Sequence, residues 1–381
     1  MIKYDFLIIG AGFFGATCAR LLTNNGYKCL IIEKENHVGG LAATQTINDI
    51  DIHMYGGHVI HTDDQDVWEF LQGYGNIVDY KLNIKSQYNN EYFQLPLNMN
   101  LLNKIYKVNY PKEGLEKIEE DRKNYGVMYR RNLEEEFIYQ IGFKPYMFTL
   151  KNYYEKMFGL ECKNLSIAYT RDIRCDLTYD TNYYSNKFCG VPIEGYTKMV
   201  ENIIGDDIDI MLNQDFIKNK DKFLKLGAII ISSIPIDRFC NYVYGPLDWG
   251  TMKYELKDFS KETSNKFGAP IIRINDKDNI MLEMIEHKWL NPQKDTEEFN
   301  THTYVSYVFP DTWTPDKECL FAINSEDSEK LLNKYIDFVN ENYPNLIFGG
   351  RQGLYRNLSI ADTVRLAIDL VNDIINANSS N

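Results

Sequence analysis

The sequence predicts an α/β fold in which both ends of the 381-residue chain contribute to one parallel sheet. Three observations support this prediction. The chain begins with the order strand, glycine-rich turn and helix; an acidic residue ends the strand that follows; and the C-terminal end repeats the same order of strand, glycines and helix. Alternation of strands and helices is typical of a parallel sheet covered by helices.

The first unit reads as β-α-β. The apolar run Phe6–Ile9 is of strand length and leads into the sequence Gly10-Ala-Gly-Phe-Phe-Gly15. Residues 16–22 have the apolar spacing of a helix, and Lys28–Ile32 is a second buried strand. Strands joined in this way are parallel neighbours.

Two later segments extend the same sheet. Ala228–Ser232 has the composition of another buried strand, and Leu346–Phe348 is a third apolar run of strand length. Gly349 and Gly350 follow it, and a long amphipathic helix runs from Ile360 to about residue 375. The two ends of the chain therefore form one domain, with other material inserted between them.

The inserted segments differ in character. Residues 97–165 are rich in Glu, Lys, Tyr and Met with helical periodicity, whereas residues 242–323 alternate apolar and polar residues as antiparallel strands do. The predicted domains are residues 1–80, 195–240 and 325–381 for the Rossmann-type domain, 97–190 for a helical domain, and 81–96 with 241–324 for an antiparallel sheet domain.

The glycine-rich turn predicts a dinucleotide site. In Gly-x-Gly-x-x-Gly after a strand, Gly10 permits the tight turn, Gly12 lets backbone N–H groups approach a pyrophosphate, and Gly15 allows close packing of helix on strand. Glu33 ends the second strand 18 residues after Gly15, where a carboxylate binds the adenosine ribose.

Two further glycine turns favour FAD over NAD. Gly39 and Gly40 follow Glu33 closely and allow the chain to pass near an extended cofactor. The C-terminal segment Phe-Gly-Gly-Arg351 supplies another turn with a cation suited to the pyrophosphate or ribityl part. Two chain ends that contact one cofactor predict a flavin that stays bound.

Composition excludes several classes of protein. The net charge of −13 disfavours nucleic acid as a partner, and no run of about 18 apolar residues predicts a membrane span. The start of the chain lacks the features of an export signal, so we expect a cytoplasmic protein. The seven dispersed cysteines predict reduced thiols. His58 and His61 have no cluster of carboxylates or thiols beside them, so no metal site is expected.

The chain resembles the bacterial UDP-galactopyranose mutases over nearly its whole length. The stretches that carry the resemblance are IIGAGFFGA, IIEKENHVGGLA, IHMYGGHVIHT, FQLPLNMN, NYYEKMFG, TNYYSNKFCGVPIEGYTKM, IEHK and FGGR. The resemblance implies an FAD-binding Rossmann-type domain, a helical domain with a mobile substrate loop, and an antiparallel sheet.

The resemblance also implies an activity. The family interconverts the pyranose and furanose forms of a nucleotide sugar, with UDP-galactopyranose and UDP-galactofuranose as the default pair for cell-surface polysaccharide biosynthesis. N5 of reduced FAD attacks the anomeric carbon and forms a flavin–sugar adduct, so no catalytic residue from the protein is required. An external donor such as NAD(P)H reduces the flavin. A homo-oligomer is possible.

The predicted site residues come from the motifs and from the resemblance together. His58 and His61 would lie beside the flavin as supporting residues. Arg171 and Arg174 are candidates for the substrate phosphates. The predicted cofactor-binding residues are Gly10, Gly12, Phe13, Gly15, Glu33, Lys34, Gly39, Gly40, His58, His61, Gly350 and Arg351, and the predicted substrate-binding residues are Asn83, Tyr153, Phe158, Tyr183, Arg171 and Arg174.

The chain departs from the family where the substrate diphosphate is held. Positions that carry arginine or tyrosine in the family are occupied here by Glu283, Gly250, Phe309 and Asn357. Either Arg171, Arg174, Arg238 or Arg273 rebuilds the cationic site from other positions, or the substrate carries a different leaving group.

Two other functions remain open at this stage. A flavin oxidoreductase on the same scaffold would be reduced by its substrate and would release peroxide. A relative that binds FAD without catalysis would contain flavin but would not convert a sugar.

Overall fold

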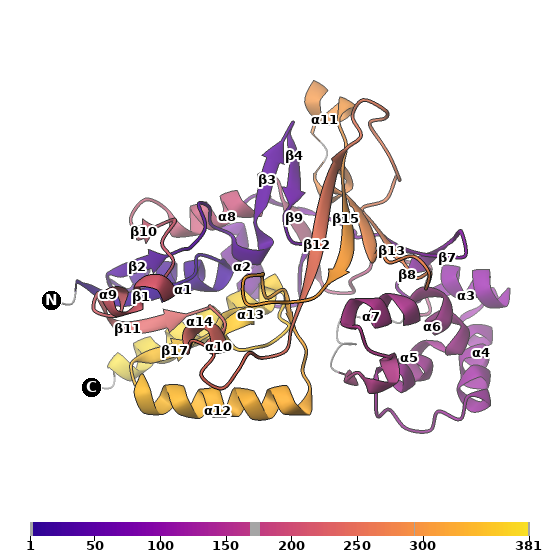
Figure 1. Cartoon of the computed structure of the whole chain (residues 1–381). Coiled ribbons are helices and arrows are strands. Elements are labelled where there is room, and N and C mark those ends of the chain that lie inside the picture. The colour runs from indigo at the N-terminus through magenta and orange to yellow at the C-terminus, as the bar shows by residue number, and fades with distance from the viewer. Residues whose placement is uncertain (1–2, 168–175, 293, 380–381) are drawn as a thin grey trace.

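The computed structural model describes residues 3–167, 176–292 and 294–379. A parallel sheet with both chain termini lies at one end of the molecule, a tall mixed sheet stands in the middle, and a group of helices lies at the other end (Figure 1). No helix among the described residues is both long enough and apolar enough to cross a lipid bilayer.

The parallel sheet has five strands in the order β10-β2-β1-β11-β17. All four neighbouring pairs are parallel, as the β-α-β pattern predicts. Four of the five residues after Tyr4 in β1 are buried because helices cover both faces. The strands are β1 (Tyr4–Ile9), β2 (Cys29–Ile32), β10 (Asp209–Met211), β11 (Gly227–Ser232) and β17 (Leu346–Phe348).

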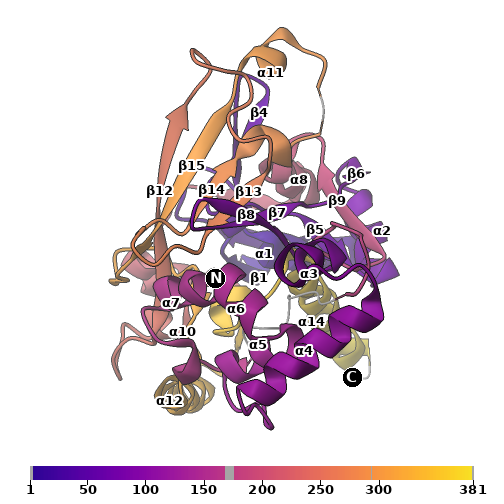
Figure 2. The same cartoon turned by 90° about the vertical axis from the view of Figure 1, so that its right-hand side faces the viewer.

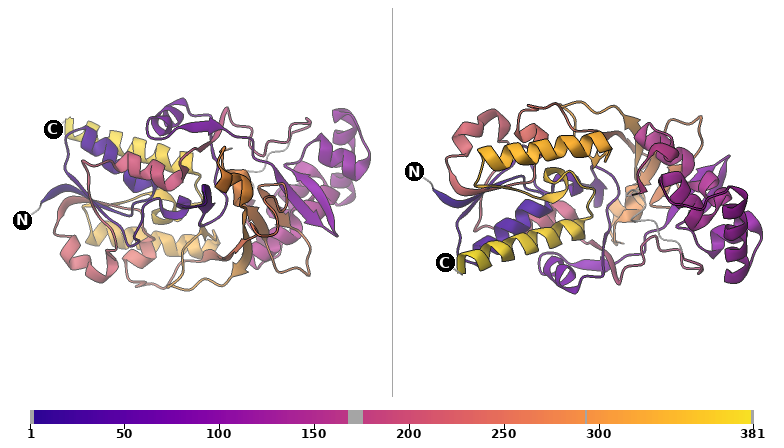
Figure 3. Two further views of the ribbon diagram at one scale, coloured as in Figure 1. Left: turned by 90° about the horizontal axis from the view of Figure 1, so that it is seen from above. Right: turned by 90° about the horizontal axis from the view of Figure 1, so that it is seen from below.

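Helices cover the two faces of this sheet as separate layers. Figure 3 shows the last helix, α14, on one face and α12 on the other. One apolar cluster joins the sheet to α1 (Phe13–Asn24), α8 (Gly195–Ile204) and α14 (Ile360–Ser379). A second joins it to α9 (Lys220–Phe223), α10 (Ile236–Phe239) and α12 (Glu326–Asn342).

The middle sheet has seven strands in the order β16-β12-β15-β14-β13-β7-β8. Neighbouring strands in this sheet are antiparallel, as predicted, except for β7 and β13, which pair in parallel. The hairpin of β7 and β8 comes from an early part of the chain and adds to the edge of a later meander. The strands are β7 (Ile84–Tyr88), β8 (Glu91–Leu95), β12 (Trp249–Asp258), β13 (Ile271–Ile274), β14 (Glu283–Glu286), β15 (Tyr304–Asp311) and β16 (Phe321–Ala322).

Smaller elements connect the two large sheets. A hairpin and a three-stranded sheet, in which β9 lies between β5 and β6, lie between them. The strands are β3 (Thr44–Ile47), β4 (Ile50–His53), β5 (Ile60–Thr62), β6 (Ile77–Asp79) and β9 (Phe188–Pro192). The chain also forms the short helices α2 (Gln65–Gln72), α11 (Glu297–Thr301) and α13 (Gly350–Gly353).

Among the described residues, five helices form the remaining layer, which packs below the edge of the middle sheet (Figure 2). They bury aromatic and aliphatic side chains against β7 and β8. The helices are α3 (Met99–Tyr106), α4 (Pro111–Asn124), α5 (Leu133–Ile141), α6 (Phe143–Thr149) and α7 (Lys151–Phe158).

Hydrogen bonds fix α7 to the middle sheet. The fully buried Asn275, which follows β13, accepts the Tyr153 N–H at 3.1 Å and donates to the Met147 carbonyl at 2.8 Å. Lys156 Nζ lies 2.7–3.2 Å from four carbonyl oxygens at the end of β13 and in the turn that follows, and the charged ammonium strengthens these bonds. The position of Tyr153 relative to the sheet therefore depends on this network.

We predict that Asn275→Ala lowers the free energy of unfolding by about 2–3 kcal/mol, because it leaves a buried N–H and a buried carbonyl without partners. Urea unfolding measures the change. The matched control is Lys277→Ala, an exposed residue of the same hairpin, which should change stability by less than about 0.5 kcal/mol. Equal losses in the two variants would contradict the role of Asn275.

Candidate functional site

One large cavity lies at the carboxyl ends of the parallel strands, where open α/β sheets bind their ligands. Its volume is about 1240 Å³. Its wall begins at the glycine turn after β1 and at the end of β2, continues along the segment 233–238, and reaches the aromatic residues of α7. The cavity therefore joins the parallel-sheet domain to the helical layer.

Two glycine turns meet at the floor of this cavity. Gly10 has φ of +101° and Gly39 has φ of +106°, so both positions favour glycine. Gly12 forms a bridge with Gly39, and a Cβ placed on Gly40 would lie 3.2 Å from the Gly12 Cα. A Cβ on Gly15 would lie 2.0 Å from the Gly10 carbonyl oxygen, so only glycine lets α1 approach the strand. These contacts fit the predicted dinucleotide motif.

The acidic residue at the end of β2 is part of the same floor. Glu33 is 7% exposed, and its carboxylate accepts the N–H groups of Ala11 at 2.8 Å and Glu35 at 2.9 Å. Its carboxylate therefore bridges the glycine turn and the end of β2. Lys34 also lines the cavity, and its ammonium pairs with Glu318.

The C-terminal glycine turn contributes the opposite wall. Gly350 has φ of +71° and packs against Phe14 of α1. Arg351 lines the cavity and donates to the carbonyl oxygens of Leu320 at 3.0 Å and Leu358 at 2.8 Å. Its guanidinium therefore holds two wall segments together.

Both predicted histidines line the cavity. The ring of His61 stacks on Tyr184 at 3.7 Å between centroids, and its Nδ1 lies 3.0 Å from Asn186 Oδ1. His58 Nε2 lies 2.9 Å from the Leu41 carbonyl oxygen, which can only accept, so Nε2 carries the proton of a neutral ring. Burial, with a smaller contribution from the Arg351 cation, lowers the pKa of His58 to about 4.

Behind His58 lies a stack of buried histidines that the sequence analysis did not predict. The ring of His53 lies between those of His58 and His287, at 6.1 Å and 5.9 Å. His53 Nδ1 accepts the His58 N–H, and His287 Nδ1 accepts the His53 N–H. Burial lowers the pKa of His53 well below its usual value and that of His287 to about 3. The stack fixes the backbone of the turn that carries His58.

Aromatic side chains form the end of the cavity next to the helical layer. Tyr153 and Phe158 of α7, two of the predicted substrate-binding residues, line it, and Phe158 packs edge-to-face on Phe321 at 5.3 Å. Tyr154 and Tyr184 also line the cavity but were not predicted. Each of them is adjacent to another tyrosine in the sequence, and the sequence alone does not indicate which ring of such a pair faces the cavity.

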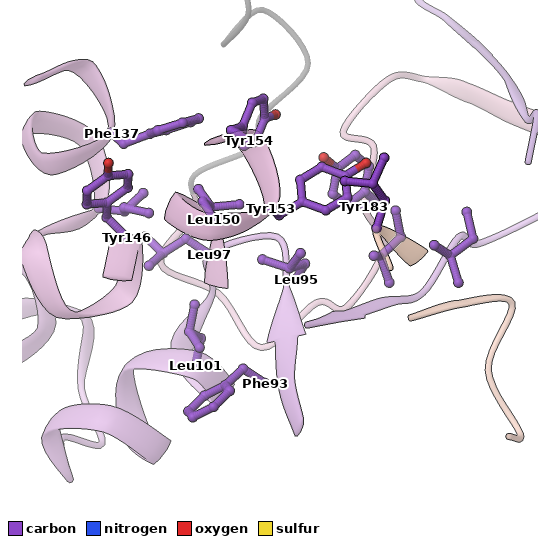
Figure 4. Packing of buried hydrophobic residues seen from close by; sticks show 14 of the residues in the cluster. Phe93, Leu95, Leu97, Leu101, Phe137, Tyr146, Leu150, Tyr153, Tyr154 and Tyr183 are labelled. Carbon is purple, nitrogen blue, oxygen red and sulfur yellow. The ribbon is translucent and has the colours of Figure 1, made fainter. Parts of the chain in front are cut away.

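Two of the predicted substrate residues, Tyr183 and Asn83, do not line the cavity. Tyr183 lies behind the wall, where Figure 4 shows it next to Tyr153. Asn83 precedes β7, and its amide donates to the Lys81 carbonyl in its own segment instead of the cavity. Arg171 and Arg174 lie outside the described residues.

The four positions at which the chain departs from the family pattern have other roles or surroundings in this structure. A Cβ on Gly250 would lie 2.0 Å from the Phe321 ring, so no longer side chain fits there. Asn357 lines the cavity and exchanges hydrogen bonds with the backbone of Ala322. Phe309 is a half-buried residue of β15. Glu283 lies beside Arg273, and burial raises the pKa of its carboxyl above the usual value although the Arg273 cation partly offsets this effect.

The structure separates the two candidate arginines that lie among the described residues. Arg238 lines the wall near the end of β2 and donates to the carbonyl oxygens of Pro315 and Lys317 and to Tyr242 Oη. Arg273 lies at the opposite, aromatic end, with its guanidinium 4.9 Å from the Tyr153 ring centre. Of these two described arginines, Arg273 is the one that lies beside the residues predicted to bind substrate.

Family models match two parts of the chain. The model of the UDP-galactopyranose mutase family matches residues 148–357, and the model of an NAD(P)-binding Rossmann-like domain matches residues 8–74. The first match covers more than half of the chain, including α7, strands β12 to β16 of the middle sheet and the C-terminal glycine turn.

Two related mutases match over almost their full length. A protein of Klebsiella pneumoniae described as "Probable UDP-galactopyranose mutase" is 27% identical over 99% of this chain and 96% of its own. The dTDP-fucopyranose mutase of Escherichia coli is 27% identical over 95% and 96%. A solved structure of reduced UDP-galactopyranose mutase superposes with a TM-score of 0.70 at 15% identity, covering 98% of this chain and 96% of that one, which shows a shared fold.

We predict that the folded protein loses stability as the pH falls from 7 to 5. Unfolded histidines bind protons below pH 6.5, whereas His53, His58 and His287 stay neutral when folded, so stability rises with pH in this range. Each of these histidines should lower the free energy of unfolding by about 2 kcal/mol at pH 5 relative to pH 7. Urea unfolding at both pH values tests this. In His287→Gln the loss should be smaller by about 2 kcal/mol; a pH-independent stability of the unsubstituted protein would be contrary evidence.

Proposed function

The chain belongs to the UDP-galactopyranose mutase family, a family of isomerases, and we propose that it interconverts the pyranose and furanose forms of a nucleotide sugar with a flavin as cofactor. The observation that carries the proposal is that one continuous cavity includes both the glycine turns and the aromatic residues of α7. Cofactor and sugar can then meet in one space.

The residues on the floor fit FAD. The bridge between Gly12 and Gly39 leaves no side chain between the two turns, and α1 begins at Phe13 without a side-chain cap, so its first N–H groups are available to a pyrophosphate. Glu33 would accept the ribose hydroxyls, and Arg351 would stand at the opposite wall. When reduced and bound there, the flavin would supply N5 as the nucleophile for the anomeric carbon.

The protein's own residues would then bind the nucleotide sugar and orient it. His58 is neutral, and its Nε2–H donates to the Leu41 carbonyl oxygen, so that atom offers no proton to the reacting centre. The stacked rings of His61 and Tyr184 form a rigid wall section. Tyr153 and Phe158 supply flat apolar surfaces suited to a base and a sugar face.

We propose UDP-galactose as the default substrate, with a dTDP-linked deoxyhexose as the second candidate because one relative is a dTDP-fucopyranose mutase. The external reductant, for instance NAD(P)H, a cytoplasmic location, a role in supplying galactofuranose for cell-surface polysaccharide, and assembly into a homo-oligomer all remain predictions of this proposal.

The direct test is conversion by the reduced protein. With dithionite under anaerobic conditions, the protein should convert UDP-galactofuranose to the pyranose form, and the oxidised protein should not; chromatography of the nucleotide sugars measures this. Cyanoborohydride added during turnover should leave the sugar covalently linked to the flavin. Absence of turnover with all UDP- and dTDP-hexoses tested would contradict the proposal, and flavin reduction by the sugar with release of peroxide would favour an oxidoreductase.

We predict that Arg351→Ala lowers the flavin content of the purified protein at least several-fold, because the carbonyl oxygens of Leu320 and Leu358 lose their common donor at the cofactor wall. The ratio of flavin absorbance to protein absorbance measures retention. Arg131→Ala, which removes an exposed partner of Glu135 in the helical layer, is the control and should retain flavin as the unsubstituted protein does. Full occupancy in Arg351→Ala would remove this role.

A further inference from the structure

Arg273 and Glu283 form an ion pair beside the aromatic end of the cavity. They occupy β13 and β14 and face each other in the antiparallel register. Arg273 Nε lies 3.9 Å from Glu283 Oε2, and the two side chains are 15% and 13% exposed. Arg273 lines the cavity, and the Tyr153 hydroxyl donates to Glu283 Oε2 at 3.3 Å.

The guanidinium of Arg273 is only partly satisfied by the protein. Its Nη1 donates to Tyr183 Oη at 3.1 Å, and the rings of Tyr153 and Tyr183 lie 4.9 and 5.3 Å from its central carbon. Its buried Nε makes no hydrogen bond within the described part of the chain. The 3.9 Å separation from Glu283 is an electrostatic contact but too long for a hydrogen bond.

A guanidinium has five N–H donors in one plane, and a buried donor without an acceptor is costly. Arg273 therefore has unused donors in a partly desolvated position that faces a cavity. The charge is also shielded from water, so its attraction for an anion is stronger than at the surface. Such a group is suited to the paired oxygens of a phosphate.

The other arginines on the described cavity wall are less suited to that role. Arg238 and Arg351 donate to backbone carbonyls, and Arg365 pairs with Asp64 of the segment before α2. Arg356 lines the cavity but is exposed to solvent, where water weakens its attraction for an anion. Arg273 combines burial, unused donors and a position beside the predicted sugar site.

Resting on the proposed function, we propose that Arg273 binds the diphosphate of the nucleotide sugar and that Glu283 is the counter-ion with which this diphosphate competes. In the absence of substrate, Glu283 neutralises the buried guanidinium. The diphosphate then takes up the donors that the ion pair leaves unused. A carboxylate near the bound diphosphate also weakens its binding, which favours release of the nucleotide sugar after reaction.

Isothermal titration of the flavin-loaded protein with UDP tests this assignment apart from turnover. Arg273→Gln should weaken UDP binding at least tenfold, and Arg273→Lys, which keeps the charge but loses the planar donors, should lie in between. Uridine, which lacks phosphate, should bind the Arg273→Gln and unsubstituted proteins within twofold of each other. Lys253→Gln, an exposed residue of β12 paired with Glu255, is the control and should leave UDP binding unchanged.

The counter-ion role has its own variants. Glu283→Gln removes the competing charge and should tighten UDP binding about threefold or more. In the double variant, Glu283→Gln should also recover part of the affinity lost in Arg273→Gln, because the single change leaves a buried carboxylate facing the diphosphate. Weaker UDP binding by Glu283→Gln would overturn the counter-ion role. Flavin absorbance and the melting temperature of each variant identify proteins that have lost their fold.

The outcomes separate this inference from the proposed function. If the unsubstituted protein binds neither UDP nor dTDP, the proposed function is contradicted. If it binds UDP and Arg273→Gln binds UDP within twofold of the same affinity, the assignment of Arg273 is overturned while the proposed function stands. Equal weakening of uridine and UDP by Arg273→Gln would also overturn it, since the lost contact would then not involve phosphate.

Discussion

Two glycine turns approach each other at the carboxyl edge of the parallel sheet, and the floor of the cavity follows from that contact. Gly12 bridges Gly39, and a Cβ on Gly40 would lie 3.2 Å from the Gly12 Cα. Larger residues at these places would separate the turns or fill the channel between them. The same approach brings the end of β2 near the glycine turn, where Glu33 accepts the Ala11 N–H. The binding channel is therefore formed largely by backbone, because the glycines at these positions have no side chains.

The opposite end of the cavity depends on the attachment of α7 to the middle sheet. Asn275 and Lys156 bind backbone groups across this junction, so the register of α7 relative to β13 is set by hydrogen bonds as well as by apolar packing. This register sets the position of Tyr153, whose side chain contacts both Arg273 and Glu283. Stability of the helical layer and geometry of the predicted sugar site are therefore coupled.

The parts of the site that the sequence predicted are local in the chain. Gly10, Gly12 and Gly15 lie within six residues, and Glu33 follows at the spacing of one helix and one strand, so their meeting requires only a β-α-β unit. The parallel sheet could be predicted for the same reason. The parallel pairing of β7 with β13 could not, because it joins strands that lie far apart in sequence and depends on how two domains dock.

The histidine stack and the ion pair escaped prediction for a related reason. His53 and His287 are 234 residues apart, and only the packing of β4 against the segment after β14 brings them together. Arg273 and Glu283 are close in sequence, but a shift of one residue in the register of β13 and β14 would place their side chains on opposite faces. A candidate arginine can be found by inspection of the chain, whereas its partner depends on strand register.

Charge balance explains why the acidic residue at position 283 is compatible with an anionic substrate. A lone buried guanidinium would carry an uncompensated charge whenever the site held no ligand, at a large cost in solvation. Glu283 lowers that cost, yet at 3.9 Å it does not take up the Nε donor of Arg273. The pair is therefore close enough to stabilise the free protein and loose enough to leave donors for a phosphate. An arginine at position 283 would add a second cation beside Arg273, so the identity of one residue constrains the other across the strand pair.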